Sequence, residues 1–179
     1  MLKITIPGIE YYDEEKEEFR MSKKTTLQLE HSLVSVAKWE AKWKKPYLSK
    51  HDKTVEEIVD YIRCMTITQN VDPTLYPLIP SEQLERIRAY IDDPMTATTI
   101  SNRNPRKSRE VMTAEIIYYQ MVSLNIPFEC QKWHLNRLLT LINVCNIKNG
   151  PNKKMSKREI MRQNAALNAA RRSRLGSRG

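Results

Sequence analysis

The fold class of this chain is decided by residues 128–145, which read FECQKWHLNRLLTLINVC. Apolar side chains recur in this stretch at spacings of three and four residues, which is the period of an α-helix. So broad an apolar face is typical of a helix buried in the middle of a domain. We therefore predict a central helix over these residues. Its apolar face comprises Phe128, Leu135, Leu138, Leu139 and Ile142, widened by Leu141 and Cys145.

Four earlier segments also show the helical period, and we predict a helix in each. In residues 26–43 both tryptophans share a face with leucine and valine, and the lysines lie opposite. The next helix begins with a capping box formed by Thr54 and Glu57, and the third follows Pro80. The fourth covers residues 114–124. The expected buried positions are Leu29, Leu33, Val36, Trp39, Trp43, Ile58, Val59, Ile62, Met65, Leu84, Ile87, Ile91, Ile117, Met121 and Leu124.

The beginning of the chain has the pattern of strands. Residues 2–6 alternate apolar and polar side chains, and residues 9–12 and 19–21 flank an acidic tip at 13–18. We predict a small hairpin here, with the tip as a solvated turn or a docking surface for a basic partner. Residues 95–100 are also β-prone and form either a second hairpin or an extended excursion. The predicted fold class is mainly α (α+β).

The net charge of +9 is concentrated near the other end of the sequence. Residues 148–179 contain ten Lys or Arg and a single acid, Glu159, whereas the remaining residues carry 20 basic and 20 acidic side chains. The polar segment Asn149-Gly-Pro-Asn152 separates the two parts. We therefore predict a neutral helical body over residues 1–148 and a basic arm over residues 149–179, which we expect to bind a partner.

The arm has the features of a helix. Ser156 and Glu159 form a second capping box, and the alanines that follow have high helix propensity. Its apolar stripe is thin, because Ile160 and Leu167 are seven residues apart with Met161 beside them. Such a helix buries little surface and is marginal in water, so we expect it to dock on something.

Several kinds of site are disfavoured by the composition. The chain has four glycines and none between positions 9 and 149, so a glycine-rich phosphate-binding loop is excluded. Cys130 and His134 stand four residues apart on the expected central helix, but two ligands do not make a structural zinc site, and packing is the better interpretation. No segment marks an activated nucleophile. We predict no enzyme, cofactor, metal or membrane span, and reduced thiols at the three cysteines.

Residues 39–50 interleave aromatic side chains with lysines, a combination that can bind single-stranded nucleic acid. The helical wheel instead places Trp39 and Trp43 among core positions and the lysines toward solvent. We therefore interpret this segment as core with a solvated face.

Four runs together give the chain a resemblance to a known family. They are TLQLEHSLVSVAKWEAKW at 26–43, DYIRCM at 60–65, KWHLNRLL at 132–139 and KMSKREI at 154–160, continued by the arm. With them, the sequence resembles small tail-module proteins of tailed bacteriophages, over essentially its whole length, and is most similar to tail assembly chaperones. The resemblance implies a non-enzymatic role in virion morphogenesis, with the tape-measure or another tail protein as partner. It also implies a location in the cytoplasm of the infected host, with the virion as an alternative.

The candidate partner-binding residues are the cations of the arm. Their number would also suit a nucleic-acid phosphate backbone, although no DNA-binding module is recognisable. We place a protein partner first, nucleic acid second, and keep self-association and a structural subunit of the tail or connector as further alternatives. The residues are Lys153, Lys154, Lys157, Arg158, Arg162, Arg171, Arg172 and Arg174.

Overall fold

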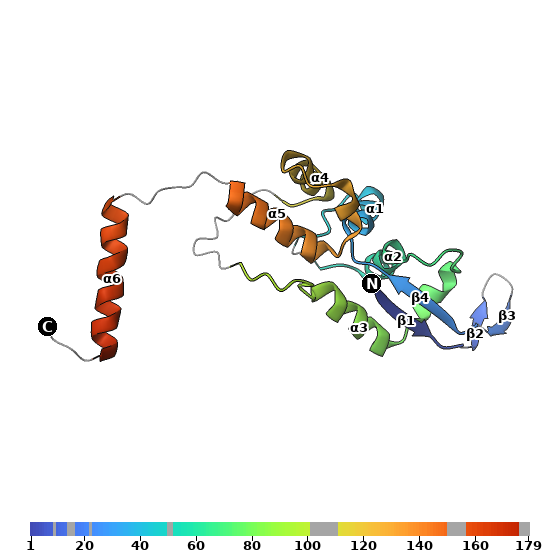
Figure 1. Ribbon diagram of the computed structural model, residues 1–179. Coiled ribbons are helices and arrows are strands. Elements are labelled where there is room, and N and C mark those ends of the chain that lie inside the picture. The colour runs from blue at the N-terminus through green and yellow to red at the C-terminus, as the bar shows by residue number, and fades with distance from the viewer. Residues whose placement is uncertain are drawn as a thin grey trace. The chain divides into compact units, whose positions relative to one another are not determined.

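The computed structural model describes residues 1–8, 10–13, 17–21, 23–49, 52–100, 111–149 and 157–175. The chain divides into two compact units, the body Met1–Lys148 and the arm Asn149–Gly179. The fold is mainly helical with antiparallel strands at its start, which confirms the predicted class (Figure 1). The elements are β1 Leu2–Ile6, β2 Glu10–Asp13, β3 Glu18–Met21, β4 Thr25–Leu29, α1 Leu33–Trp43, α2 Val55–Met65, the 3-10 helix η1 Pro73–Leu78, α3 Ser81–Asp92, α4 Ala114–Ser123, the 3-10 helix η2 Phe128–Lys132, α5 Leu135–Asn149 and α6 Lys157–Leu175.

The strands form two antiparallel pairs. In the first, β1 pairs with β4 so that Ile4 faces Leu27 and Ile6 faces Thr25. Alternate side chains of this pair point into the core, where Ile4 and Leu27 are buried. In the second, β2 pairs with β3 and forms the small hairpin. Figure 1 shows this hairpin beyond the ends of β1 and β4, away from α4 and α5.

The prediction of a helix beginning at Thr26 was wrong, because residues 25–29 form strand β4. Two successive threonines favour extended backbone, and Leu27 and Leu29 occupy alternate positions that both face the core. The helix starts later, after Ser32, whose hydroxyl accepts a hydrogen bond from the Ser35 amide in a capping box. The strand therefore ends with Leu29, a residue that also fits the helical period of the apolar side chains in α1.

α1 and α2 pack against each other. Trp39 is buried, and its indole N–H donates to the Glu57 carbonyl of α2 over 2.9 Å. The capping box at the start of α2 is confirmed, since the Thr54 amide donates to Glu57 Oε2 and the Glu57 amide donates to the Thr54 hydroxyl. One expected core residue, Ile58, is instead exposed, and Tyr61 is buried in its place.

Glu40 of α1 links two other segments of the body, a contact that the sequence patterns did not predict. This carboxylate is buried, and it accepts two backbone hydrogen bonds of 2.7 Å, one from the Tyr47 amide and one from the Ala114 amide. The first fixes the turn after α1 and the second fixes the N-terminus of α4, where a negative charge is favourable. The Glu40 carboxylate therefore supplies both amides with the hydrogen-bond acceptor that water would otherwise provide.

The prediction of one central helix over residues 128–145 was also wrong. The segment begins after Pro127 as η2, whose side chain Phe128 is 55% exposed, and helix α5 starts only at Leu135. Between them, His134 pairs with Ser32 in an isolated β-bridge, and the Leu135 amide donates to the His31 carbonyl over 2.7 Å. This long-range hydrogen bond takes the place of the one that the Leu135 amide would make in a continuous helix, so Cys130 and His134 do not stand one turn apart on a single helix.

The core of the body collects side chains from both strands of the first pair and from every helix of the body. Among the expected positions, Leu84 is exposed rather than buried. Residues 95–100 form no strand, so the second hairpin was a wrong alternative; the segment is irregular, with left-handed backbone at Met95 and a bend at Ala97. The buried apolar residues include Ile4, Ile6, Leu27, Leu29, Leu33, Val36, Trp39, Ile62, Met65, Ile87, Ile117, Met121, Leu135, Leu138 and Ile142.

Candidate partner-binding surface on the C-terminal helix

Helix α6 carries the candidate surface, which we call the arm helix. It runs from Lys157 to Leu175, about 28 Å at the usual helical rise. Every side chain of it that the structure describes is exposed. The interior is rich in alanine and asparagine, which bury little area, so the helix has no apolar face broad enough to form a core of its own.

The described cations of the arm helix form two groups. Arg158 and Arg162 are four residues apart and lie on the same side of its first half. Arg171, Arg172 and Arg174 occupy the last turns, where the negative end of the helix dipole stabilises them. Like charges four residues apart cost about 0.2–0.5 kcal/mol, so a binding partner that supplies carboxylates would relieve repulsion in the first half.

Two apolar side chains accompany these arginines. Met161 is 71% exposed and Leu167 is 51% exposed. Their positions differ by six residues, so on an ideal helix they point about 120° apart and lie about 9 Å apart along the axis, and Arg171 lies beyond Leu167 toward the C-terminus. The surface therefore offers exposed guanidinium groups and two exposed apolar side chains on one short helix.

Some of the predicted residues cannot be placed on this surface. Lys153 and Lys154 lie outside the described residues, as does Ser156 with its predicted capping box. Lys157 is the first residue of α6, but the position of its side chain is not described. The surface as the structure shows it consists of Arg158, Met161, Arg162, Leu167, Arg171, Arg172 and Arg174.

Two lysines of the segment 39–50, Lys42 in α1 and Lys45 just after it, are held by carboxylates of the body. Lys42 forms an ion pair with Asp60, and Lys45 forms one of 2.6 Å with Glu57. The indole N–H of Trp43 also donates to Asp60, over 2.9 Å. Hydrogen bonds from Lys42 and Trp43 outweigh burial and hold the pKa of Asp60 below its ordinary value. This segment is therefore an internal contact of the body.

A buried cluster of rings contains the two described histidines. His31 Nδ1 lies 2.5 Å from the Tyr61 hydroxyl, and His134 Nε2 lies 2.9 Å from the Tyr90 carbonyl. The two imidazole rings are 5.1 Å apart, edge to face. Burial, together with the neighbouring His134, lowers the pKa of His31 to about 3, so His31 is neutral at physiological pH.

The structure also shows features that the sequence patterns did not reveal. An apolar groove of about 370 Å³ lies between α2 and α3, with Ile58 and Leu84 at its surface and Lys53 and Arg88 as its charged lining residues. The hairpin β2–β3 exposes Tyr12, Phe19 and Met21. Their exposure could have been recognised from sequence only after the pairing register of the hairpin was known.

Comparisons with protein-family models, with curated proteins and with solved structures found no match. In the described part of the chain, no helix is both long and apolar enough to cross a membrane. Nor do the described His, Cys, Asp and Glu side chains gather in any group of three that could hold a metal ion.

Proposed function

We propose that this chain is a non-enzymatic morphogenesis protein of a bacteriophage tail, acting as a tail assembly chaperone that binds the tape-measure protein through its arm helix. The observation that carries the proposal is the exposure of every described side chain of α6, five arginines and two large apolar residues among them. A helix that presents this combination gains most by binding an acidic amphipathic segment.

The resemblance to small tail-module proteins supports the choice of partner. A tape-measure protein is very long and helical, and its exposed apolar stripes would aggregate before the tail tube surrounds them. A protein of this size, present in many copies, can cover such stripes with a short helix each. The charges of the arm helix then select the acidic side of the partner, while Met161 and Leu167 contact its apolar side.

Binding of a nucleic acid is the second candidate function, and the number of exposed arginines favours it. A phosphate backbone contacted by five of them would release counterions, and the logarithm of the affinity would fall with the logarithm of salt at a slope of about −4 to −5. A structural subunit of the tail or connector is a third candidate, which detection of the chain in purified virions would favour.

The test compares two probes on the full chain. Tagged protein is incubated with the tape-measure protein of the same phage and, separately, with non-specific duplex DNA over a salt series. We expect retention of the tape-measure protein, reduced at least about tenfold in R162E/R171E/R172E, because the three contacts are reversed in sign. A variant with the same change of net charge on the body, K3E/K38E/K132E, is the control and should bind as the original does.

Two results would reject the proposal. One is micromolar binding of duplex DNA with the steep salt slope given above, lost in the arm variant and not in the control. The other is equal capture of the tape-measure protein by the arm variant and the original chain, since the arm helix would then contribute nothing.

A further inference from the structure

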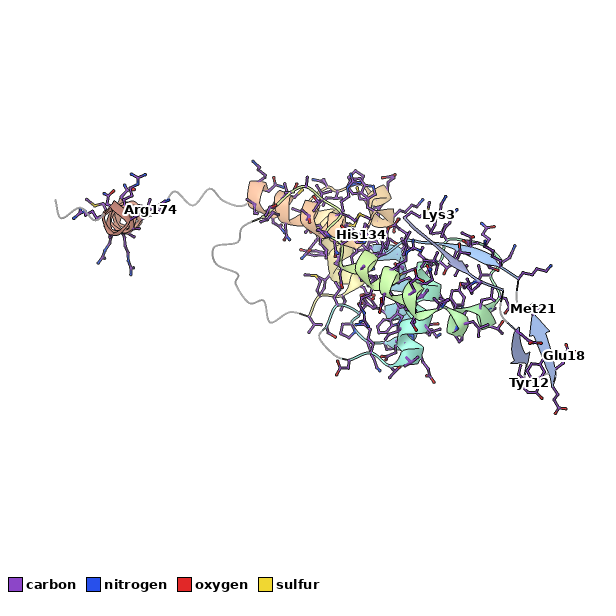
Figure 2. The ribbon with its side chains drawn as sticks, turned by 90° about the horizontal axis from the view of Figure 1, so that it is seen from below. Lys3, Tyr12, Glu18, Met21, His134 and Arg174 are labelled. Carbon is purple, nitrogen blue, oxygen red and sulfur yellow. The ribbon has the colours of Figure 1, made fainter. Side chains whose placement is uncertain are left out.

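The hairpin β2–β3 presents a second surface with exposed apolar side chains. Phe19 is 72% exposed and Met21 is 73% exposed, and the rings of Tyr12 and Phe19 contact edge to face at 5.2 Å. Figure 2 shows Tyr12, Glu18 and Met21 at one end of the body, where the hairpin extends from β1 and β4. Exposed aromatic and thioether groups side by side are typical of a contact surface.

The pairing register places these side chains on one face. Glu10 pairs with Met21, and Tyr12 pairs with Phe19. Side chains two positions apart on a strand point to the same face of the sheet. The face therefore consists of Glu10, Tyr12, Phe19 and Met21, all exposed. We call it the hairpin face. It combines three apolar side chains with a carboxylate.

The charge of the hairpin is opposite to that of the arm helix. Residues 10–21 contain six acids against Lys16 and Arg20. Residues 157–175 contain six Lys or Arg against Glu159. Glu10 and Glu17 are exposed on the hairpin, as the five described arginines are on the arm helix. Each surface therefore has the chemistry that the other lacks, and both carry exposed apolar side chains.

The position of the hairpin on the body favours contact between copies. Helix α5, which leads into the arm, ends at Asn149, and both views place that end of the body opposite the hairpin (Figures 1 and 2). A second copy can present its arm helix to the hairpin from outside, whatever the placement of its own arm.

We infer that the hairpin face of one copy binds the arm helix of a second copy. Each copy carries one of each surface, so the contact is heterologous and repeats head to tail, giving chains or rings. A strand of four residues covers about 14 Å, roughly half of the arm helix, so the interface is small and the association weak. The inference does not depend on the tape-measure partner, because its test contains this chain alone.

The experiment is sedimentation equilibrium of the full chain from about 5 to 500 µM, at about 50 mM and 500 mM salt, a range over which the screening length falls severalfold. We expect the average mass to rise above the monomer value of 21.0 kDa with concentration at low salt and to return toward it at high salt. A constant 21.0 kDa at every concentration would overturn the inference, and docking within one copy would produce that same result.

Charge reversal identifies the two surfaces. Two variants reverse the charge of one surface each: E10K/E17K/E18K on the hairpin and R162E/R171E/R172E on the arm helix. Each variant alone should remain monomeric at low salt, because its two surfaces then carry charge of the same sign. A one-to-one mixture should associate, because the hairpin of each variant then meets an arm helix of opposite charge. The hairpin control, E82K/E85K/E129K, changes the net charge equally at exposed positions elsewhere and should associate as the original does.

Apolar contact is checked with F19S/M21S, which should weaken association at least about fivefold by removing exposed side chains that the fold does not bury. Loss of association in the E82K/E85K/E129K control to the same extent as in the hairpin variant would overturn the inference, since net charge alone would explain the effect. Failure of the mixture to associate would also overturn it.

Discussion

The buried His31 makes the stability of the body dependent on pH in a range where few other groups titrate. Its pKa is lowered to about 3 in the folded chain by burial and by the neighbouring His134, against about 6.5 in an unfolded chain. Below pH 6.5 the unfolded state therefore binds the proton and the folded state does not. Stability falls as the pH is lowered from 6.5 toward 3 and is fully retained above 6.5.

The size of the effect follows from the two pKa values. At pH 5, the proton bound by the unfolded state favours unfolding by about 2 kcal/mol relative to pH 7.5, from one histidine. Carboxylates with ordinary unfolded pKa values near 4 contribute little above pH 5. Replacing the imidazole with an amide that does not titrate, in H31Q, should remove this loss, although the variant starts from lower stability.

The assay is urea unfolding of the original chain and of H31Q between pH 5 and 7.5. Intrinsic tryptophan fluorescence reports on the body alone, because Trp39, Trp43 and Trp133 all lie within it. We expect the unfolding free energy of the original chain to decrease by about 2 kcal/mol over this range and that of H31Q to change by well under half as much. Equal pH dependence of the two proteins would refute the assignment of the effect to His31.

Three further predictions concern packing, a buried carboxylate and the arm. Leu135→Ala should lower the unfolding free energy by about 2–5 kcal/mol because Leu135 is fully buried, whereas Ile147→Ala at an exposed position of the same helix should change it by under about 0.5 kcal/mol in the same urea titration. Glu40→Ala leaves two backbone amides without their acceptor, so it should lower the unfolding free energy by at least about 2 kcal/mol. Glu85→Ala on the surface of α3 is the control. An unfolding free energy lowered as little by Glu40→Ala as by the control would contradict the role given to Glu40. Ala169→Gly in the arm helix should lower helical circular dichroism, since glycine costs about 1 kcal/mol in a helix interior, and should leave the tryptophan-monitored transition of the body unchanged.

Local patterns were sufficient to predict most helices of the body and the capping box of α2. The capping box at Thr54 and Glu57 needs only residues three positions apart, and the buried face of α1 needs only the helical period. Both are properties of a short segment, so the structure reproduces them. The exposure of Ile58 and Leu84 is different, because it depends on where α2 and α3 leave a groove between them.

Two elements depended on contacts that no local pattern contains. Leu29 satisfies both a helical and a strand period, whereas Leu27 fits only the strand, and pairing with β1 decides for the strand. Residues 133–134 lie inside the stretch over which apolar side chains recur with the helical period, yet His134 bridges to Ser32, more than a hundred positions earlier. In both cases tertiary pairing overrides local propensity.

The two candidate binding surfaces also differ in how far the sequence alone predicts them. Clustered cations and an alanine-rich interior predicted the arm helix, since charge and helix propensity can be counted along a sequence. The hairpin face could not be predicted from counting, because Glu10 and Met21 share a face only through their pairing across the turn. A register assumption that aligned Tyr12 with Phe19 would have revealed it.

The hydrogen bond from the Leu135 amide to the His31 carbonyl has a consequence for synthesis of the protein. A ribosome makes β1, β4, α1 and α2 long before residue 135, so these elements can pair early while the side of the body that α5 completes remains open. Contacts between residues so distant in sequence also form slowly. A nascent chain halted between residues 66 and 135 would expose core leucines for as long as the pause lasts, and cellular chaperones would meet it in that form.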